Sequence, residues 1–297
     1  MAADPVARES LRVQILAAAK QLGEAGVGSP RFDAEELAAY LLGTPRTKLG
    51  LHPLVEPAWV HTYSELVQRR ADRVPLQHLT GTAALGRITV QVGPGVFIPR
   101  PETEVLVEWA LAAIKDVETP VVVDLCSGSG AIALAIAAAR PDAAVHAVEN
   151  APGALAWARR NADLHSAGGG TPIHLRGGDF TDQRLLTDLD GTADLVTANP
   201  PYVPSGTVVD PEVSDHDPAE AVFGGLDGMD VIRPLISVAA GLLKPGGVLA
   251  MEHDDTHGDS VPALLAARRV LADVADHDDL TGRPRFVTAR RVTMPPR

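Results

Sequence analysis

The chain has 297 residues, 45% apolar and 22% charged, a composition that excludes intrinsic disorder, at a length that predicts two domains. Its single cysteine, Cys126, excludes an internal disulfide framework and a multi-cysteine zinc site, and favours a reducing compartment. The net charge is −12; residues 1–87 hold 10 basic and 9 acidic residues, which leaves 16 basic and 29 acidic for the remainder, a poor match for bare nucleic acid.

The first segment, to about residue 74, is predicted to be a small helical domain. It begins without the basic and apolar regions of a signal peptide, and no apolar run approaches the ~20 residues that cross a bilayer, so we expect a cytoplasmic protein without membrane contact. Apolar residues recur at helical spacing from Leu11 to Ala19, and amphipathic stretches cover 33–42 and 59–70. Because no catalytic constellation appears there, residues 1–74 are interpreted as a substrate-recognition or packing domain.

Residues 75–95 are predicted to form a β-hairpin linker, because the stretch 87–92 alternates apolar and polar residues. The lone His78 is interpreted as structural. The next block, 98–104 (Ile-Pro-Arg-Pro-Glu-Thr-Glu), leads into an apolar-periodic helix, and its second proline and its acids suit a helix's first turn. Phe97 and Arg100 are candidates for a ligand site, and a purely structural role for both is an equally good interpretation.

A buried strand, a tight turn of small residues and a helix follow one another between Pro120 and Ile136. Glycines let the backbone come close to a ligand, and a helix N-terminus presents free N–H groups. The following strand, 144–148, ends at Glu149, where a Rossmann-type unit places a carboxylate on ribose hydroxyls. The candidate ligand-binding residues of the turn are Asp124, Cys126, Ser127, Gly128, Ser129 and Gly130.

This pattern alone fits NAD, FAD or S-adenosylmethionine. Its spacing is not G-x-G-x-x-G, which counts against the dinucleotides, and it has no P-loop lysine, so a nucleoside ligand without phosphate is favoured. After a third strand at 173–177, Asp179 can accept a hydrogen bond from an adenine amino group and Phe180 can pack on the base, although a buried phenylalanine after a strand is more often part of the core. None of the ten histidines has metal-ligand spacing, so no metal site is expected.

The fourth predicted strand, 193–198, is stopped by the prolines of Asn199-Pro200-Pro201-Tyr202, because proline has no N–H for a ladder. In open α/β sheets the carboxyl ends of strands form the ligand-binding edge. The side-chain oxygen of Asn199 and the carbonyl of Pro200 are two acceptors held by the following prolines, which suits capture of a planar NH2 group, and the Tyr202 ring offers a stacking surface. A plain proline-rich turn is the structural alternative.

The remaining elements continue the alternation of strands and helices. The polar segment 203–228 is too long for an ordinary connection and is predicted to be a lid or substrate-recognition loop. Helices are predicted over 230–243 and 260–271, with strands over 248–252 and 285–292.

Five motifs in this order resemble the bacterial release-factor glutamine methyltransferases, the HemK/PrmC-type family. The resemblance covers nearly the whole chain. Asn-Pro-Pro-Tyr is shared with amino-directed DNA and RNA methyltransferases, whereas the block 98–104 is more specific to the family. The motifs are Gln77-His78-Leu79-Thr80-Gly81, Ile98-Pro99-Arg100-Pro101-Glu102-Thr103-Glu104, Asp124-Leu125-Cys126-Ser127-Gly128-Ser129-Gly130, Asn199-Pro200-Pro201-Tyr202 and Gly224-Gly225-Leu226-Asp227-Gly228.

The resemblance implies a class I methyltransferase, with a Rossmann-like mixed seven-stranded sheet and helices on both faces over 96–297, after the helical domain and the hairpin. It implies S-adenosylmethionine as donor, S-adenosylhomocysteine as product, and methylation of the glutamine amide in the Gly-Gly-Gln motif of class 1 release factors. Carried over by motif, the turn from Cys126 to Gly130 approaches the methionine part, Glu149 the ribose and Phe180 the adenine. Asn199, Pro200, Pro201 and Tyr202 bind the glutamine, with Asn199 also close to the cofactor.

Two positions depart from the family pattern. Cys126 occupies a usual glycine position, and His216-Asp217-Pro218 resembles an aromatic-Glu-Pro element with both leading residues changed.

The competing interpretations are a DNA or RNA amino-methyltransferase and, in a different class, a binding protein or NAD-type oxidoreductase. The first is expected to carry a basic surface, which this acidic chain does not show; the acidic balance suits a basic protein partner, although solubility alone also explains it. The expected state is a monomer without direct nucleic-acid contacts.

Overall fold

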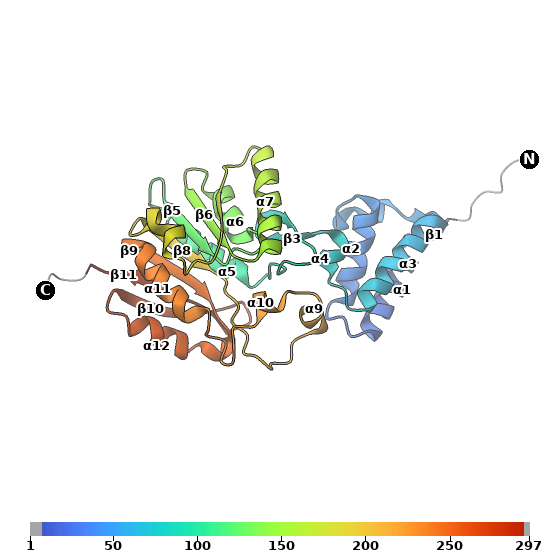
Figure 1. Ribbon diagram of the computed structural model, residues 1–297. Coiled ribbons are helices and arrows are strands. Elements are labelled where there is room, and N and C mark those ends of the chain that lie inside the picture. Colours follow the sequence, from blue (N-terminus) through green and yellow to red (C-terminus); the bar gives the residue numbers. More distant parts are fainter. Residues whose placement is uncertain (1–7, 294–297) are drawn as a thin grey trace, which may run out of the picture. The chain divides into compact units, whose positions relative to one another are not determined.

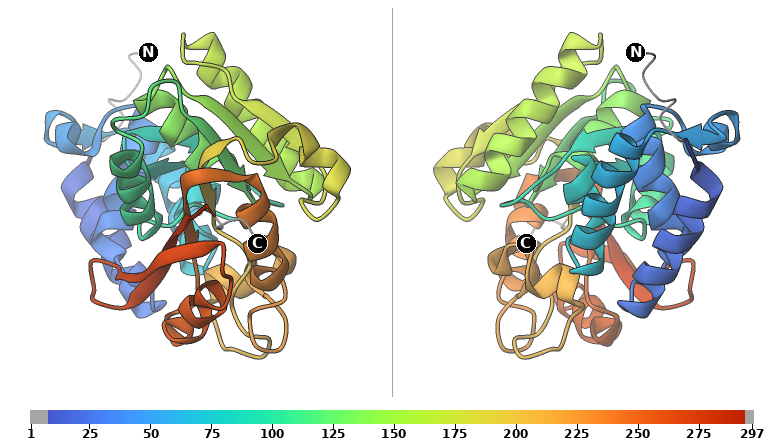
Figure 2. Two further views of the ribbon diagram at one scale, coloured as in Figure 1. Left: turned by 90° about the vertical axis from the view of Figure 1, so that its left-hand side faces the viewer. Right: turned by 90° about the vertical axis from the view of Figure 1, so that its right-hand side faces the viewer.

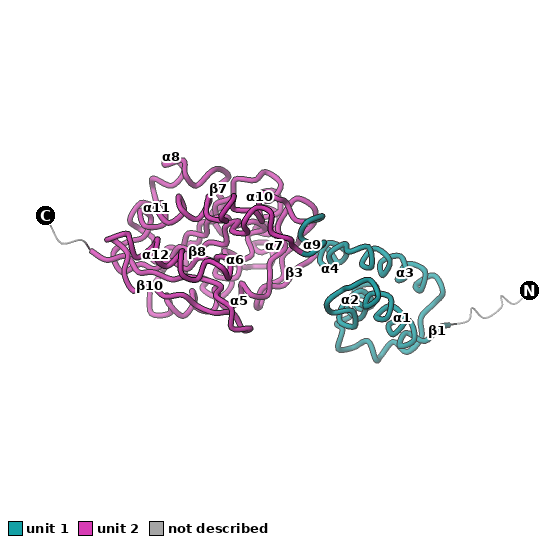
Figure 3. Tube along the Cα trace, turned by 90° about the horizontal axis from the view of Figure 1, so that it is seen from below, with its two compact units in different colours: residues 1–81, 210–216 teal, residues 82–209, 217–297 magenta. Residues whose placement is uncertain are grey.

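The computed structural model describes residues 8–293, which divide into two compact units (Figure 3). The first unit comprises the chain up to Gly81 together with Asp210–His216. The second comprises Thr82–Val209 and the chain from Asp217 onwards. No helix in the described part of the chain is both long and apolar enough to span a bilayer.

The first unit is a set of helices around one apolar core, and the three helical stretches predicted from the sequence lie within α1, α2 and α3. Proline begins α2 and α3, where no intrahelical N–H is required. In the core, the Tyr63 hydroxyl donates to the Ala34 carbonyl at 2.7 Å, and its ring stacks on Trp59. The elements are β1 (Glu9–Ser10), α1 (Leu11–Glu24), α2 (Pro30–Leu42), η1 (Arg46–Leu51), β2 (Leu54–Val55), α3 (Pro57–Ala71), α4 (Leu76–Thr80) and α9 (Pro211–Ser214).

A carboxylate far along the chain ties α9 into the first unit. Oε1 of Glu212 on α9 lies 2.8 Å from a guanidinium nitrogen of Arg70 and 2.8 Å from one of Arg73. Arg70, which is buried, also donates to Asp33 at 2.7 Å. Partial burial acts to raise the pKa of Glu212, but hydrogen bonds from Arg73 and Arg70 lower it to about 2. Part of the segment predicted to be a lid is therefore a component of the helical unit.

The second unit is a seven-stranded mixed sheet in the order β10-β11-β9-β8-β5-β6-β7 (Figure 1). The five strands from β9 to β7 are parallel, and β11 pairs antiparallel with both β9 and β10. This arrangement confirms the fold class expected from the sequence. The strands are β5 (Val121–Leu125), β6 (Ala144–Glu149), β7 (His174–Gly177), β8 (Ala193–Ala198), β9 (Leu243–Glu252), β10 (Leu271–Asp278) and β11 (Pro284–Arg291).

Helices cover both faces of this sheet. Successive residues of a strand point to opposite faces, so neighbouring residues pack against helices on different sides. Val122 belongs to a core cluster with residues of α5 (Thr103–Ala113), α6 (Ala131–Ala139) and α7 (Pro152–Ala167). Its neighbour Val123 belongs to a second cluster with residues of α11 (Ile232–Leu242) and α12 (Ser260–Ala266). Figure 2 shows the twisted sheet with helices on either side. The helices, 3-10 turns and hairpin strands are β3 (Thr82–Leu85), β4 (Ile88–Gln91), α5 (Thr103–Ala113), α6 (Ala131–Ala139), α7 (Pro152–Ala167), α8 (Gln183–Leu186), η2 (Thr187–Leu189), α10 (Ala219–Val222), α11 (Ile232–Leu242), η3 (Asp255–His257) and α12 (Ser260–Ala266).

Two sequence-based boundaries were wrong. The predicted linker 75–95 starts with the short helix α4, so only 82–91 forms the hairpin. The helix predicted over 260–271 ends at Ala266, and strand β10 begins at Leu271. Strand β10 lies at the sheet edge with mostly unburied side chains, and an irregularity between Ala272 and Ala275 breaks its alternation, so it leaves no period-two apolar pattern to detect.

Candidate active site

Four parallel strands of the second unit are in register at their carboxyl ends, which places the residues one position further along in a row. Leu125 pairs with both Val148 and Ala198, and Ala198 pairs with Met251. The next residues are therefore neighbours along one sheet edge. Across the order β9-β8-β5-β6 they are Glu252, Asn199, Cys126 and Glu149.

A cavity of about 190 Å³ opens at this edge, within the second unit. Nine sequence-predicted site residues line it, whereas Arg100, Asp124, Gly130, Asp179, Pro200 and Tyr202 do not. The nine are Phe97, Cys126, Ser127, Gly128, Ser129, Glu149, Phe180, Asn199 and Pro201.

The loop between β5 and α6 bends through three residues with positive φ. Cys126 has φ 57°, Gly128 φ 56° and Gly130 φ 82°. A Cβ built at Gly128 meets no protein atom within 4 Å, so the backbone there faces open space. Cys126 adopts a conformation that favours glycine, which agrees with its place at a usual glycine position. Burial, with Glu149 and Asp124 nearby, raises the pKa of its thiol and keeps it protonated.

Glu149 closes this loop from the end of β6. One carboxylate oxygen accepts from the Gly128 N–H at 2.8 Å and the other from the Ala151 N–H at 2.8 Å. Burial raises the pKa of Glu149, and these backbone hydrogen bonds oppose the rise. Because a carboxylate oxygen has more than one acceptor site, each can still accept from a ligand hydroxyl in the cavity.

Asp124 and Asp179 lie near the loop but do not line the cavity. Asp124 is fully buried, and its Oδ1 accepts from the Thr197 hydroxyl at 2.8 Å, which joins β5 to β8. Burial raises the pKa of Asp124 to about 7. Asp179 Oδ1 accepts from both the N–H and the hydroxyl of Thr181, so it shapes the turn after β7.

Arg100 contacts the chain beyond the tetrapeptide instead of lining the cavity. Its guanidinium stacks over the Phe97 ring at 4.7 Å and pairs with the buried carboxylate of Asp217, which also accepts from the Ile98 N–H at 3.4 Å. Asp217 belongs to the altered His-Asp-Pro element, and the next residue, Pro218, lines the cavity. The carboxylate is thus retained despite the change from Glu, and it ties two sequence motifs together.

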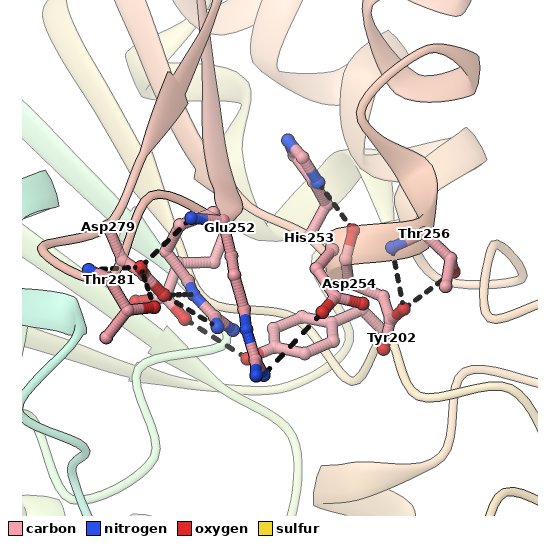
Figure 4. A network of polar contacts seen from close by, with 10 residues as sticks. Tyr202, Glu252, His253, Asp254, Thr256, Asp279 and Thr281 are labelled. Carbon is pink, nitrogen blue, oxygen red and sulfur yellow. Dashed lines mark hydrogen bonds and ion pairs between the residues drawn. The ribbon is translucent and has the colours of Figure 1, made fainter.

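Polar side chains of two other elements contact the Asn199-Pro200-Pro201-Tyr202 segment, and one of them, Thr103, also lines the cavity. Asn199 Nδ2 lies 3.5 Å from the hydroxyl of Thr103, the first residue of α5. The Tyr202 hydroxyl donates to Glu252 Oε2 at 3.4 Å (Figure 4), and its ring packs against the core beneath the sheet edge. Burial raises the pKa of Glu252 to about 7.

Sequence reasoning missed Thr103 and Glu252. The sequence places Thr103 in the motif 98–104 at a helix start and Glu252 at the end of a strand, without a site role for either. The pairing of Ala198 with Met251 makes Glu252 the neighbour of Asn199, and no local pattern carries that information. No group of acidic, histidine and cysteine side chains that could hold a metal ion occurs among residues 8–293.

Known proteins resemble both units. The PrmC N-terminal domain family matches residues 15–81, and the methyltransferase small domain family matches residues 88–215. The release factor glutamine methyltransferase of Mycolicibacterium smegmatis is 51% identical over 282 residues, which cover 95% of this chain and 98% of the relative. That of Streptomyces coelicolor is 50% identical over 285 residues, with coverage of 95% and 98%. A crystal structure of the release-factor-specific protein-(glutamine-N5) methyltransferase from Alicyclobacillus acidocaldarius is 27% identical, covers 68% of this chain and 99% of that chain, and gives a TM-score of 0.39.

Proposed function

This chain belongs to the release factor glutamine methyltransferase family, and we propose that it methylates the side-chain amide of the glutamine in the Gly-Gly-Gln motif of class 1 peptide chain release factors. The observation that carries the proposal is the position of Asn199 on the sheet edge, beside the cavity and beside the Cys126 loop. The residue proposed to bind the amide and the loop proposed to bind a nucleoside then line the same cavity.

The cavity residues fit S-adenosylmethionine as the methyl donor. Glu149, with acceptor capacity beyond its two backbone hydrogen bonds, would hold the ribose hydroxyls. Phe180 would pack near the adenine, and the open backbone at Gly128 would admit the methionine part. When bound, S-adenosylmethionine supplies an electrophilic methyl group on a sulfonium sulfur. S-adenosylhomocysteine is the product that must leave.

The protein's part in the reaction is to orient a weak nucleophile. An amide nitrogen is a poor nucleophile because its lone pair is delocalised into the carbonyl. Asn199 Oδ1 and the Pro200 carbonyl would accept the two hydrogens of the glutamine amide and aim its nitrogen at the methyl group. No base is required before attack, since the proton leaves afterwards, and positioning supplies most of the rate enhancement.

Labelled S-adenosylmethionine tests the proposal directly. The protein is incubated in parallel with release factors, DNA and RNA, and any methylated residue is located by mass mapping. We expect label on the Gly-Gly-Gln glutamine alone. Label in DNA or RNA would instead support the amino-methyltransferase alternative, and S-adenosylmethionine that fails to bind while NAD binds would support the oxidoreductase.

We also propose that the enzyme acts as a cytoplasmic monomer. Light scattering after size-exclusion chromatography tests the oligomeric state, with a mass near 31.1 kDa expected. A mass twice as large at working concentration would contradict it.

A further inference from the structure

Asn199 can serve the proposed function only if its amide faces the correct way. An asparagine side chain carries one oxygen acceptor on one side and an NH2 donor on the other, and rotation by half a turn exchanges them. With the oxygen towards the cavity, the side chain accepts from a substrate NH2 group. With the nitrogen towards the cavity, two donors would face each other. The surrounding hydrogen bonds decide between these orientations.

Thr103, which also lines the cavity, is the group that contacts the amide nitrogen of Asn199. It is 2% exposed, it begins α5, and its Oγ1 lies 3.5 Å from Asn199 Nδ2. At this length the hydrogen bond is weak in the resting enzyme, and catalytic hydrogen bonds often tighten when substrate binds. A hydroxyl both donates and accepts, so Thr103 alone does not determine which face of Asn199 it receives.

Glu252 removes that ambiguity. Its side chain is 2% exposed, it neighbours Asn199 on the sheet edge, and its Oε1 is buried without a hydrogen-bonding partner. The Thr103 hydroxyl is among the groups that lower the pKa of Glu252 against the effect of burial. In its ionised form the Glu252 carboxylate only accepts, so it draws the Thr103 hydrogen. The Thr103 oxygen is then left to accept, and it can accept only from the nitrogen side of Asn199.

We propose that Thr103 and Glu252 form a positioning pair that fixes the Asn199 amide with its Oδ1 towards the substrate glutamine. The proposal rests on the proposed function for the identity of that substrate. Glu252 also receives the Tyr202 hydroxyl at 3.4 Å (Figure 4). One buried carboxylate then acts on both ends of the Asn199-Pro200-Pro201-Tyr202 segment. Arg285, which acts on Glu252 to lower its pKa, bonds Asp279 at 3.0 Å and supports the network from the neighbouring strand.

Thr103→Val tests the pair, because it removes the hydroxyl and keeps the branched shape. We expect single-turnover methylation of a release factor, at saturating S-adenosylmethionine, to slow roughly 10- to 100-fold, the range seen when a partner that orients a functional side chain is lost. Thr103→Ser should restore the rate to within about threefold. Thr288→Val, which removes another buried hydroxyl of the same unit, is the matched control and should keep the parent rate.

A double-mutant cycle separates positioning from a general loss of structure. If Thr103 acts through Asn199, Thr103→Val should change the rate by less than about twofold in an Asn199→Ala background. Glu252→Gln, whose carboxamide can donate as well as accept, should slow the reaction and combine non-additively with Thr103→Val. Additive losses, or a parent rate in Thr103→Val, would overturn the pair.

A readout without substrate distinguishes failure of the pair from failure of the proposed function. In 15N spectra of the free protein, the Asn199 side-chain NH2 resonances are assigned by their absence in Asn199→Ala. We expect Thr103→Val to move these resonances and to speed their exchange with water, while Thr288→Val leaves them in place. Unchanged resonances would refute the pair whatever the enzyme methylates. Release factors left unmethylated by the parent protein would refute the function alone.

Discussion

The two halves of the sheet edge are built by different means. The half proposed to bind the cofactor (the cofactor half) comprises the 126–130 loop and Glu149, and backbone N–H groups that bond to one carboxylate hold it. The half proposed to bind the amide (the amide half) comprises Asn199, Thr103 and Glu252, and it relies on side chains from three separate elements. Backbone N–H groups remain in place when most side chains of the loop are substituted. A network of hydrogen-bonded side chains loses its geometry when one of its members is removed. We therefore expect the cofactor half to be robust and the amide half to be sensitive to substitution.

The largest expected effect is at Asn199. Asn199→Ala should lower single-turnover methylation by on the order of a hundredfold or more, the scale for loss of one preorganised polar group. The measurement uses saturating S-adenosylmethionine so that binding is separated from chemistry. Asn199→Asp keeps an acceptor but loses the donor to Thr103, and it serves as the companion variant. Methylation at the parent rate in Asn199→Ala would show that the proposed amide capture is wrong.

Glu149 is the sensitive position of the cofactor half. Glu149→Ala should weaken S-adenosylmethionine binding by roughly 1.5–3 kcal/mol, the range for hydrogen bonds to a charged group. Calorimetry measures this value. Because Glu149 also receives the Gly128 and Ala151 N–H groups, thermal unfolding of the variant is the control for loss of the loop. An unchanged dissociation constant would remove Glu149 from the cofactor site.

A buried acid beneath both halves should make stability depend on pH. Burial raises the pKa of Asp124 in the folded protein from its ordinary value of 3.8 to about 7. The folded state therefore keeps a proton that the unfolded state loses, so this contribution to stability is full below about pH 4 and is lost as the pH rises through 7. Asp124→Asn should reduce the fall in the free energy of unfolding between pH 5 and 8 by at least about 1 kcal/mol. Chemical denaturation across that range tests it, with exposed Asp190→Asn as the control; equal pH profiles would contradict the assignment.

The smallest effect is expected at Cys126. Cys126→Gly relieves a positive φ, worth about 1–2 kcal/mol, but adds flexibility to the unfolded chain and removes a half-buried thiol. These terms oppose each other, so the free energy of unfolding should change by less than about 1 kcal/mol, and methylation should persist. Loss of turnover with intact cofactor binding would instead give the thiol a chemical role.

The parts of the site that the sequence predicts are those formed by contiguous residues. The strand, turn and helix around Cys126, the carboxylate of Glu149 and the proline-stopped strand before Asn199 are contiguous patterns, and the structure places these residues together at one edge. The partners Thr103 and Glu252 depend on which strands adjoin, and Asp217 depends on a return of the chain to Arg100. An aromatic ring such as that of Tyr202 is able to stack on a ligand, which is what its residue type predicts. In the structure the ring packs against the core and the hydroxyl donates to Glu252, and no local sequence pattern indicates either contact.

The attachment of Glu212 to the first unit has a consequence for how this protein can evolve. The chain passes between the two units three times, after Gly81, before Asp210 and after His216. A recombination event that exchanged only the N-terminal portion would separate Arg70 and Arg73 from their shared carboxylate, leaving a buried guanidinium with Asp33 alone. A single crossover near Gly81 would therefore leave the helical unit without residues 210–216, which complete it in this chain.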